Sequence, residues 1–284
     1  MKRIVFLVPV LILFACNKEK NPSLDSIISA KDHSIIETEF SSVFDVVEDF
    51  NSNDRRVRSG QTILPSSAIV AFQDSSYTDG DGIECTINFG PIKSAAPKGF
   101  LCLDGRYRAG ILHLKMNKRY FQDSFECVVW AEDSDAYYAG NDGFSLSSIS
   151  GNMTVLKLNL SSFKISVSNA RLSNENGTIT WQSNRIIDKK VDNSAGILGD
   201  EYSITGNASG VNRKGESFEV NITEPLYKKI QMGCARTFTQ GVLDIINVSN
   251  QEKIKLDYDP YNNNACDLIA KATIRSKEFI FTVR

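Results

Sequence analysis

The sequence predicts a mainly β protein, an antiparallel meander or sandwich with one N-terminal amphipathic helix. Three observations support this fold class. Helical periodicity is confined to residues 34–51. Short stretches with alternating apolar and polar residues fill the chain from about residue 60 onward, and Gly, Asn, Asp and Ser separate them. Many strands joined by short links favour antiparallel pairing.

The N-terminal segment has the features of a secretory signal. Two basic residues precede an apolar run (residues 4–15), which is too short to span a bilayer. Leu13-Phe14-Ala15-Cys16 resembles the lipobox of bacterial lipoproteins, in which the cysteine becomes the first residue of the mature chain and carries acyl groups such as palmitate. We therefore expect residues 1–15 to be removed and Cys16 to anchor the chain in a membrane.

A polar tether and a helix come next. Residues 16–33 are rich in polar side chains and predict a flexible tether. In residues 34–51 apolar side chains recur with a period of 3.6 and form one stripe that should pack on the sheet. Ser34 is the expected N-cap, with Glu37 at capping-box spacing. The rest of the helix surface carries acidic residues, namely Glu37, Glu39, Asp45, Glu48 and Asp49.

A charged linker at residues 51–60 separates the helix from a β-rich body at residues 60–284, whose length also allows two halves, 60–145 and 146–284. Asn176-Gly177 is the clearest hairpin turn. The expected strands are 68–72, 84–89, 110–115, 126–131, 148–158, 163–172, 178–185, 201–206, 217–223, 241–247, 254–258, 268–275 and 278–283.

Five cysteines follow Cys16, and an exported protein can hold disulfides. Because five is odd, at least one thiol stays free or pairs outside the chain. The simplest pairing lies within each half of the body. It joins Cys234 to Cys266, and Cys102 to either Cys85 or Cys127.

Charge and motif content exclude several function classes. Loss of two basic residues with the signal changes the formal net charge from −2 to −4, which gives no reason to expect a nucleic-acid partner. The chain has two histidines, His33 and His113, and none of the common catalytic motifs, so we expect no catalytic residue and no enzyme activity.

The alternative is an anchored glycoside hydrolase-like enzyme, which needs only two carboxylates. Acidic residues near loops are Asp104, Asp133, Asp135, Asp142, Asp257, Asp259 and Asp267.

Two acidic pairs are candidate calcium ligands. Asp79 and Asp81, and likewise Asp257 and Asp259, place oxygen atoms close together in turns, as a hard cation requires. Asp-Gly pairs are turn formers in their own right, and neither pair matches the twelve-residue calcium loop of a helix–loop–helix motif. We expect no other metal and no cofactor.

Three aromatic residues are candidate ligand-binding groups. Trp130, Tyr137 and Tyr138 lie where an expected strand runs into a polar loop, and flat rings beside carboxylates suit the faces of sugars. Trp130 follows an apolar strand and also fits the core. The two tyrosines are therefore the candidates we expect to be exposed.

Several segments resemble uncharacterised lipoproteins of the Bacteroidota. The segments are Ile87-Asn-Phe-Gly90, the Cys102-Leu-Asp-Gly-Arg-Tyr-Arg-Ala-Gly110 run, Tyr202–Gly206, Ile222–Leu226, Cys234, Asp257-Tyr258 and Cys266-Asp267. Between the last two, this chain has a longer loop than the glycine-rich one of the family. The resemblance implies the fold and an outer-membrane location, and it supplies no activity. We therefore expect a lipid-anchored cell-envelope protein, on the periplasmic or the surface face, with a non-catalytic binding or structural role and a protein or glycan ligand.

Overall fold

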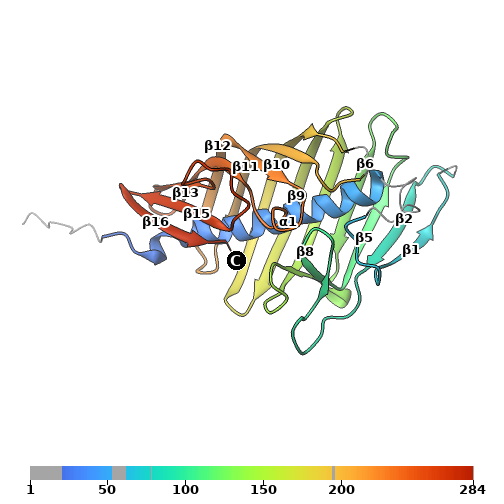
Figure 1. The fold of residues 1–284 in the computed structure, drawn as a ribbon, viewed down its shortest axis with the longest axis horizontal. Coiled ribbons are helices and arrows are strands. Elements are labelled where there is room, and N and C mark those ends of the chain that lie inside the picture. The colour runs from blue at the N-terminus through green and yellow to red at the C-terminus, as the bar shows by residue number, and fades with distance from the viewer. Residues whose placement is uncertain (1–20, 53–61, 78, 194–195, 284) are drawn as a thin grey trace, which may run out of the picture.

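The structure is a computed structural model that describes residues 21–52, 62–77, 79–193 and 196–283, except the side chain of residue 133. One long helix runs along the long axis of the molecule and crosses the strands of a single large sheet (Figure 1). The expected signal, Cys16 and most of the 51–60 linker fall outside the described residues.

The elements follow one another in a simple order. The helical elements are η1 (Leu24–Ile27), α1 (Ile28–Ser52) and η2 (Asp133–Asp135). The strands of the first half are β1 (Ile69–Asp74), β2 (Ile83–Asn88), β3 (Phe100–Leu101), β4 (Tyr107–Ala109), β5 (Ile111–Met116), β6 (Glu126–Ala131), β7 (Tyr137–Gly140) and β8 (Ser147–Lys157). Those of the second half are β9 (Ser162–Asn174), β10 (Gly177–Val191), β11 (Glu201–Val211), β12 (Ser217–Lys229), β13 (Gln240–Asn247), β14 (Glu252–Asp257), β15 (Ile269–Ile274) and β16 (Lys277–Thr282).

All strands belong to one open antiparallel sheet, which confirms the mainly β class and the meander. Its main path is β1-β2-β5-β6-β8-β9-β10-β11-β12-β13-β14-β15-β16, and β3, β4 and β7 lie beside it. Each of the expected strands corresponds to one of these elements. Because β6 pairs with β8, the sheet continues without a break from residues 60–145 into residues 146–284.

The helix is longer than its periodicity indicates. It begins at Ile28, so the second part of the expected 16–33 tether is helical and the expected N-cap is wrong. Ser34 lies inside the helix, and its hydroxyl donates to the carbonyl of Lys31. The apolar stripe packs on the sheet as expected, with the ring of Phe40 5.5 Å from Trp181 and that of Phe44 5.5 Å from Phe163.

The acidic side chains of α1 are buried as well, because the sheet and its connecting loops supply a cation to most of them. The pairs are Asp32–Arg213, Glu37–Arg185, Glu39–Arg106, Asp45–Lys228 and Glu48–Lys189. A buried carboxylate is tolerated only when it is paired and hydrogen-bonded. The sheet therefore encloses the helix on its polar side as well as along its apolar stripe.

His33 is fully buried beside this network, 3.5 Å from Glu37, and burial lowers its pKa from 6.5 to about 4. As the pH falls, the unfolded chain binds the His33 proton first, so the folded state loses stability between pH 6.5 and 4. At about 1.4 kcal/mol for each pH unit in this interval, the loss reaches about 3 kcal/mol. We expect urea denaturation to show this loss in the wild type and not in His33→Gln.

The matched control is His113→Gln, which removes the other histidine from the outer face of the sheet and leaves His33 in place, so the loss assigned to His33 should remain. Asp49, whose pKa burial raises to about 6, titrates in the same range. Because Asp49 is present in all three proteins, its contribution cancels in the comparison. Equal pH dependence of the wild type and His33→Gln would contradict the assignment.

The predicted disulfide pairing is confirmed in the second half of the chain and is wrong in the first half. Cys234 and Cys266 form a disulfide that ties the loop after β12 to the loop after β14, as predicted. The expected bridge to Cys102 is wrong: Cys85, Cys102 and Cys127 are free and buried. Cys85 lies on β2, which pairs with β1 and β5, so no neighbouring strand brings it to Cys102. Burial raises the pKa of the Cys85 and Cys127 thiols to about 12.

Candidate functional site

The outer face of the sheet, opposite α1, carries an open hollow of about 780 Å³ across strands β9 to β14. We call it the polar groove, because short polar side chains form most of its lining. Those side chains belong to Ser166, Ser168, Gln182, Asn184, Asn207, Ser209, Glu219, Asn221, Asp244 and Lys253.

Strand alternation produces this lining. Trp181 of β10 points inward to the helix, so the next residue, Gln182, points to solvent. The antiparallel register then places Asn184 beside Asn207, and Asn207 beside Asn221, on three neighbouring strands. The result is a ladder of amide side chains across the middle of the sheet.

The groove is rich in groups that both donate and accept hydrogen bonds. The Ser166 hydroxyl donates to the side chain of Asn184 at 3.1 Å, and the Gln182 amide donates to the Ser209 hydroxyl at 2.9 Å. Asp244 and Lys253 form an ion pair at 2.7 Å, so their charges offset each other. The lining therefore offers hydrogen bonds with little net charge.

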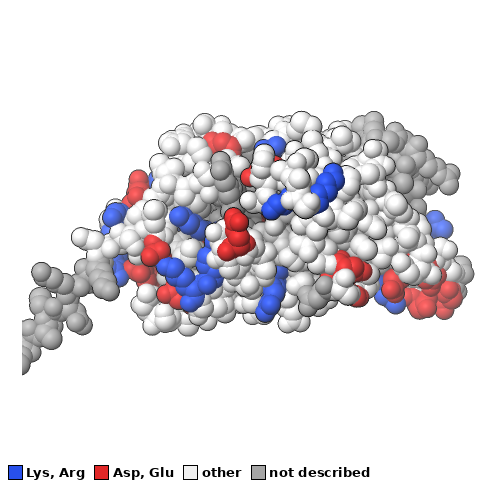
Figure 2. All heavy atoms as spheres, turned by 90° about the horizontal axis from the view of Figure 1, so that it is seen from below, with Lys and Arg blue, Asp and Glu red and all other residues white. Residues whose placement is uncertain are grey.

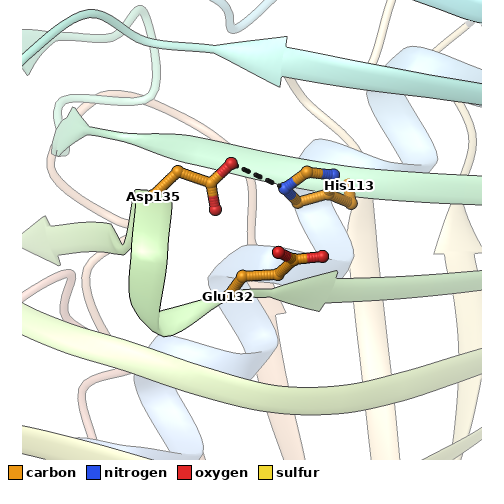
Figure 3. Close-up of side chains that lie close together, drawn as sticks. All are labelled: His113, Glu132 and Asp135. Carbon is orange, nitrogen blue, oxygen red and sulfur yellow. Dashed lines mark hydrogen bonds and ion pairs between the residues drawn. The ribbon is translucent and has the colours of Figure 1, made fainter.

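A second candidate site lies on the same outer face, toward β5 and β6. His113, Glu132 and Asp135 each direct one metal-ligating atom into a space where all three atoms lie within 4.8 Å of one another (Figure 3). We call these residues the His113 cluster. His113 comes from β5, Glu132 follows β6, and Asp135 ends the helical turn η2, which returns the chain toward β5.

Hydrogen bonds and ring stacking order the His113 cluster. Nε2 of His113 lies 3.1 Å from Oδ2 of Asp135. Trp130 is opposite His113 in the sheet, and the two rings stack at 5.3 Å with an interplanar angle of 19°. The indole N–H of Trp130 donates to Glu132 at 3.3 Å, and the hydroxyl of Ser134 donates to the other oxygen of Glu132 at 3.4 Å.

The three aromatic candidates differ in exposure, and one of them is not where the sequence predicts. Tyr137 is wholly buried, with its ring 5.7 Å from that of Phe89, so its expected exposure is wrong. The reason is that residues 137–140 form strand β7, whose alternation turns Tyr137 inward and leaves Tyr138 half-buried. Trp130 is half-buried on the outer face, next to the His113 cluster.

The two acidic pairs proposed as calcium ligands differ in whether their oxygens are used within the protein. Asp79 and Asp81 lie with Asp74 in an acidic group whose oxygens are within 4.8 Å, and acidic side chains gather at that end of the molecule (Figure 2). A hydrogen bond between the two lowers the pKa of Asp79 and raises that of Asp81. Asp257 and Asp259 instead accept backbone N–H groups of their own loop, so they stabilise the turn.

One carboxylate considered for hydrolysis has a structural role. Asp104 is fully buried, and both of its oxygens accept hydrogen bonds from Arg108 at 2.9 and 2.6 Å. Burial opposes its ionisation, but Arg108 and Arg106 together hold the pKa of Asp104 below its usual value. Asp104 is therefore a fixed anion of the core.

Comparisons with known proteins yield no relative. No family model matches the chain, no curated protein matches it, and no solved structure matches it. Over the part of the chain that the structure describes, no helix combines the length and apolar character needed to cross a membrane. Function is therefore inferred from the side chains themselves.

Proposed function

We propose that this chain is a lipid-anchored cell-envelope protein that binds an uncharged glycan in the polar groove and has no catalytic role. The observation that carries the proposal is the lining of the groove, in which amide and hydroxyl side chains from four neighbouring strands, β9 to β12, face solvent together. Each of these groups can both donate and accept, which is what sugar hydroxyls require.

The charge distribution favours a neutral ligand over an ionic one. Asp244 and Lys253 neutralise each other and the amide ladder is uncharged, so Glu219 is the one other charged side chain of the lining. The groove is open to solvent, so ordered waters can bridge the sugar to the sheet at little cost. Such a surface suits a long polymer that touches many side chains weakly. A protein partner would more commonly meet a buried apolar centre with aromatic anchors.

The N-terminal segment supports the anchoring. The basic head, the short apolar run and Cys16 together match a lipoprotein signal. At its other end the tether meets the body at Pro22, whose carbonyl accepts a hydrogen bond from Lys277 of β16. A chain of six residues reaches at most about 20 Å, at about 3.3–3.6 Å for each residue. An acylated Cys16 would therefore hold the sheet close to the membrane surface.

Replacing Asn184 and Asn207 with alanine should weaken glycan binding about tenfold or more, because each lost hydrogen bond contributes about 1 kcal/mol. A microarray of neutral polysaccharides identifies the ligand, and calorimetry with that polysaccharide measures the loss. The fold should be unchanged, since both side chains are exposed.

The matched control is Asn152→Ala, which removes an exposed asparagine from the same face of the sheet, on β8, outside the groove. It should bind like the wild type. Absence of binding to every neutral polysaccharide would overturn the proposed ligand, and equal losses in the control and the double variant would move the site away from the groove.

A further inference from the structure

We propose that the His113 cluster binds a divalent transition-metal ion, with Zn²⁺ preferred, through Nε2 of His113 and one carboxylate oxygen each from Glu132 and Asp135. This site is separate from the polar groove, and the proposal does not depend on glycan binding. The three ligands come from β5, the end of β6 and η2, so folding alone brings them together.

The spacing of the ligand atoms suits a small ion. Zinc binds imidazole nitrogen and carboxylate oxygen at about 2.0–2.2 Å, which places neighbouring ligand atoms about 3.3–3.6 Å apart in a tetrahedron. Nε2 of His113 and Oδ2 of Asp135 are already 3.1 Å apart. One carboxylate oxygen of Glu132 lies within 4.8 Å of the ligand atoms of both other residues, so all three ligand atoms already surround one small space.

A second observation points independently to a cation. The side chain of Asp135 is 31% exposed, but its Oδ1 atom is buried and has no hydrogen-bond partner among the described residues. An unpaired buried oxygen of a carboxylate costs free energy that a bound cation would recover. Asp135 therefore has one oxygen on His113 and a second oxygen that accepts no hydrogen bond from the described residues.

The chemistry of the ligands selects the metal. An imidazole nitrogen with two carboxylate oxygens suits zinc and its neighbours in the first transition row, whereas calcium and magnesium prefer oxygen ligands alone. Trp130 stacks on His113 and donates to Glu132, so it orients two of the three ligands, as second-shell groups do in metal sites. Three protein ligands leave at least one coordination position open to solvent.

Calorimetry of the purified protein with Zn²⁺ at neutral pH tests the site. We expect one ion per chain, with binding about 100-fold weaker or lost in His113→Ala and in Asp135→Asn, since even second-shell changes reduce metal affinity about 10–100-fold. Asp81→Asn is the matched control, because it alters the exposed acidic group beside β2 and should bind Zn²⁺ like the wild type. Calcium should produce no binding that depends on His113.

Tryptophan fluorescence locates the ion even if a variant folds poorly. The chain has two tryptophans, Trp130 beside the cluster and Trp181 packed against α1. Cu²⁺ quenches the fluorescence of a nearby tryptophan. It should therefore reduce the fluorescence of the wild type strongly and that of Trp130→Phe weakly. Zinc binding that persists in both ligand variants, or quenching that is equal in the wild type and Trp130→Phe, would overturn the proposal.

Discussion

Arg108→Met is expected to lower the free energy of unfolding by about 3–5 kcal/mol, the cost of leaving one partner of a buried ion pair without the other. Arg108 and Asp104 are both fully buried. The guanidinium donates to both oxygens of Asp104 and also to the hydroxyl of Ser42 on α1 at 2.7 Å, so it joins the β3–β4 region to the helix. Urea denaturation monitored by circular dichroism measures the loss.

Two further proteins make this test specific. Lys115→Met breaks an exposed pair with Glu84, in which both side chains are more than a third exposed, and should cost less than about 1 kcal/mol. Replacing Arg108 and Asp104 together with apolar residues should recover part of the loss, because no uncompensated charge then remains. A single variant as stable as the wild type would show that the pair is not needed to neutralise Asp104.

Removal of the Cys234–Cys266 disulfide is expected to lower the free energy of unfolding by about 3–4 kcal/mol. The bond closes a loop with a sequence separation of 32, and the chain-entropy relation gives a stabilisation of this size for such a loop. The double variant Cys234→Ala/Cys266→Ala should therefore unfold at a clearly lower urea concentration than the oxidised wild type.

Reductant supplies the control for this variant. Under reducing conditions the wild type should lose stability and approach the double variant, whereas the double variant should not respond. The three free thiols that the structure describes are buried, so they should not react with the reductant in the folded state. Equal denaturation midpoints for the oxidised wild type and the double variant would contradict a stabilising bond.

Most of the sheet could be predicted because its strands are long enough for alternation to be visible. β9 and β10 show this clearly, with the turn at Asn176-Gly177 between them. The missed strands are β3, β4 and β7, which have two, three and four residues and so contain too little pattern to detect. The same limit explains Tyr137, which was expected in a loop and lies in a short strand.

The environment of the helix could not be predicted from its own residues. The sequence shows Glu37 and Asp45 on the acidic side of the helix without their partners, because Arg185 and Lys228 are far away in the chain. Nothing in the periodicity of a helix shows which cations the sheet will present to it. The start of the helix was missed for a related reason, since Asp32 and His33 are polar and yet buried.

The two candidate sites depend on strand register. His113 and Trp130 were visible as single residues, but their stacking depends on the pairing of β5 with β6. The amide ladder likewise needs Asn184, Asn207 and Asn221 to align across three strands. Alternation predicts which face a residue occupies, whereas alignment between strands depends on turns and bulges that a single sequence specifies weakly.

The buried charges of α1 also constrain the order in which the molecule can be assembled. Synthesis releases the helix first, yet Arg185 follows Glu37 by 148 residues and Lys228 follows Asp45 by 183. Until those basic residues have been synthesised, enclosing the helix would bury its carboxylates without a paired cation. Enclosing the helix with its charges paired therefore requires the sheet through β12, and contacts between such distant residues are the kind that form slowly.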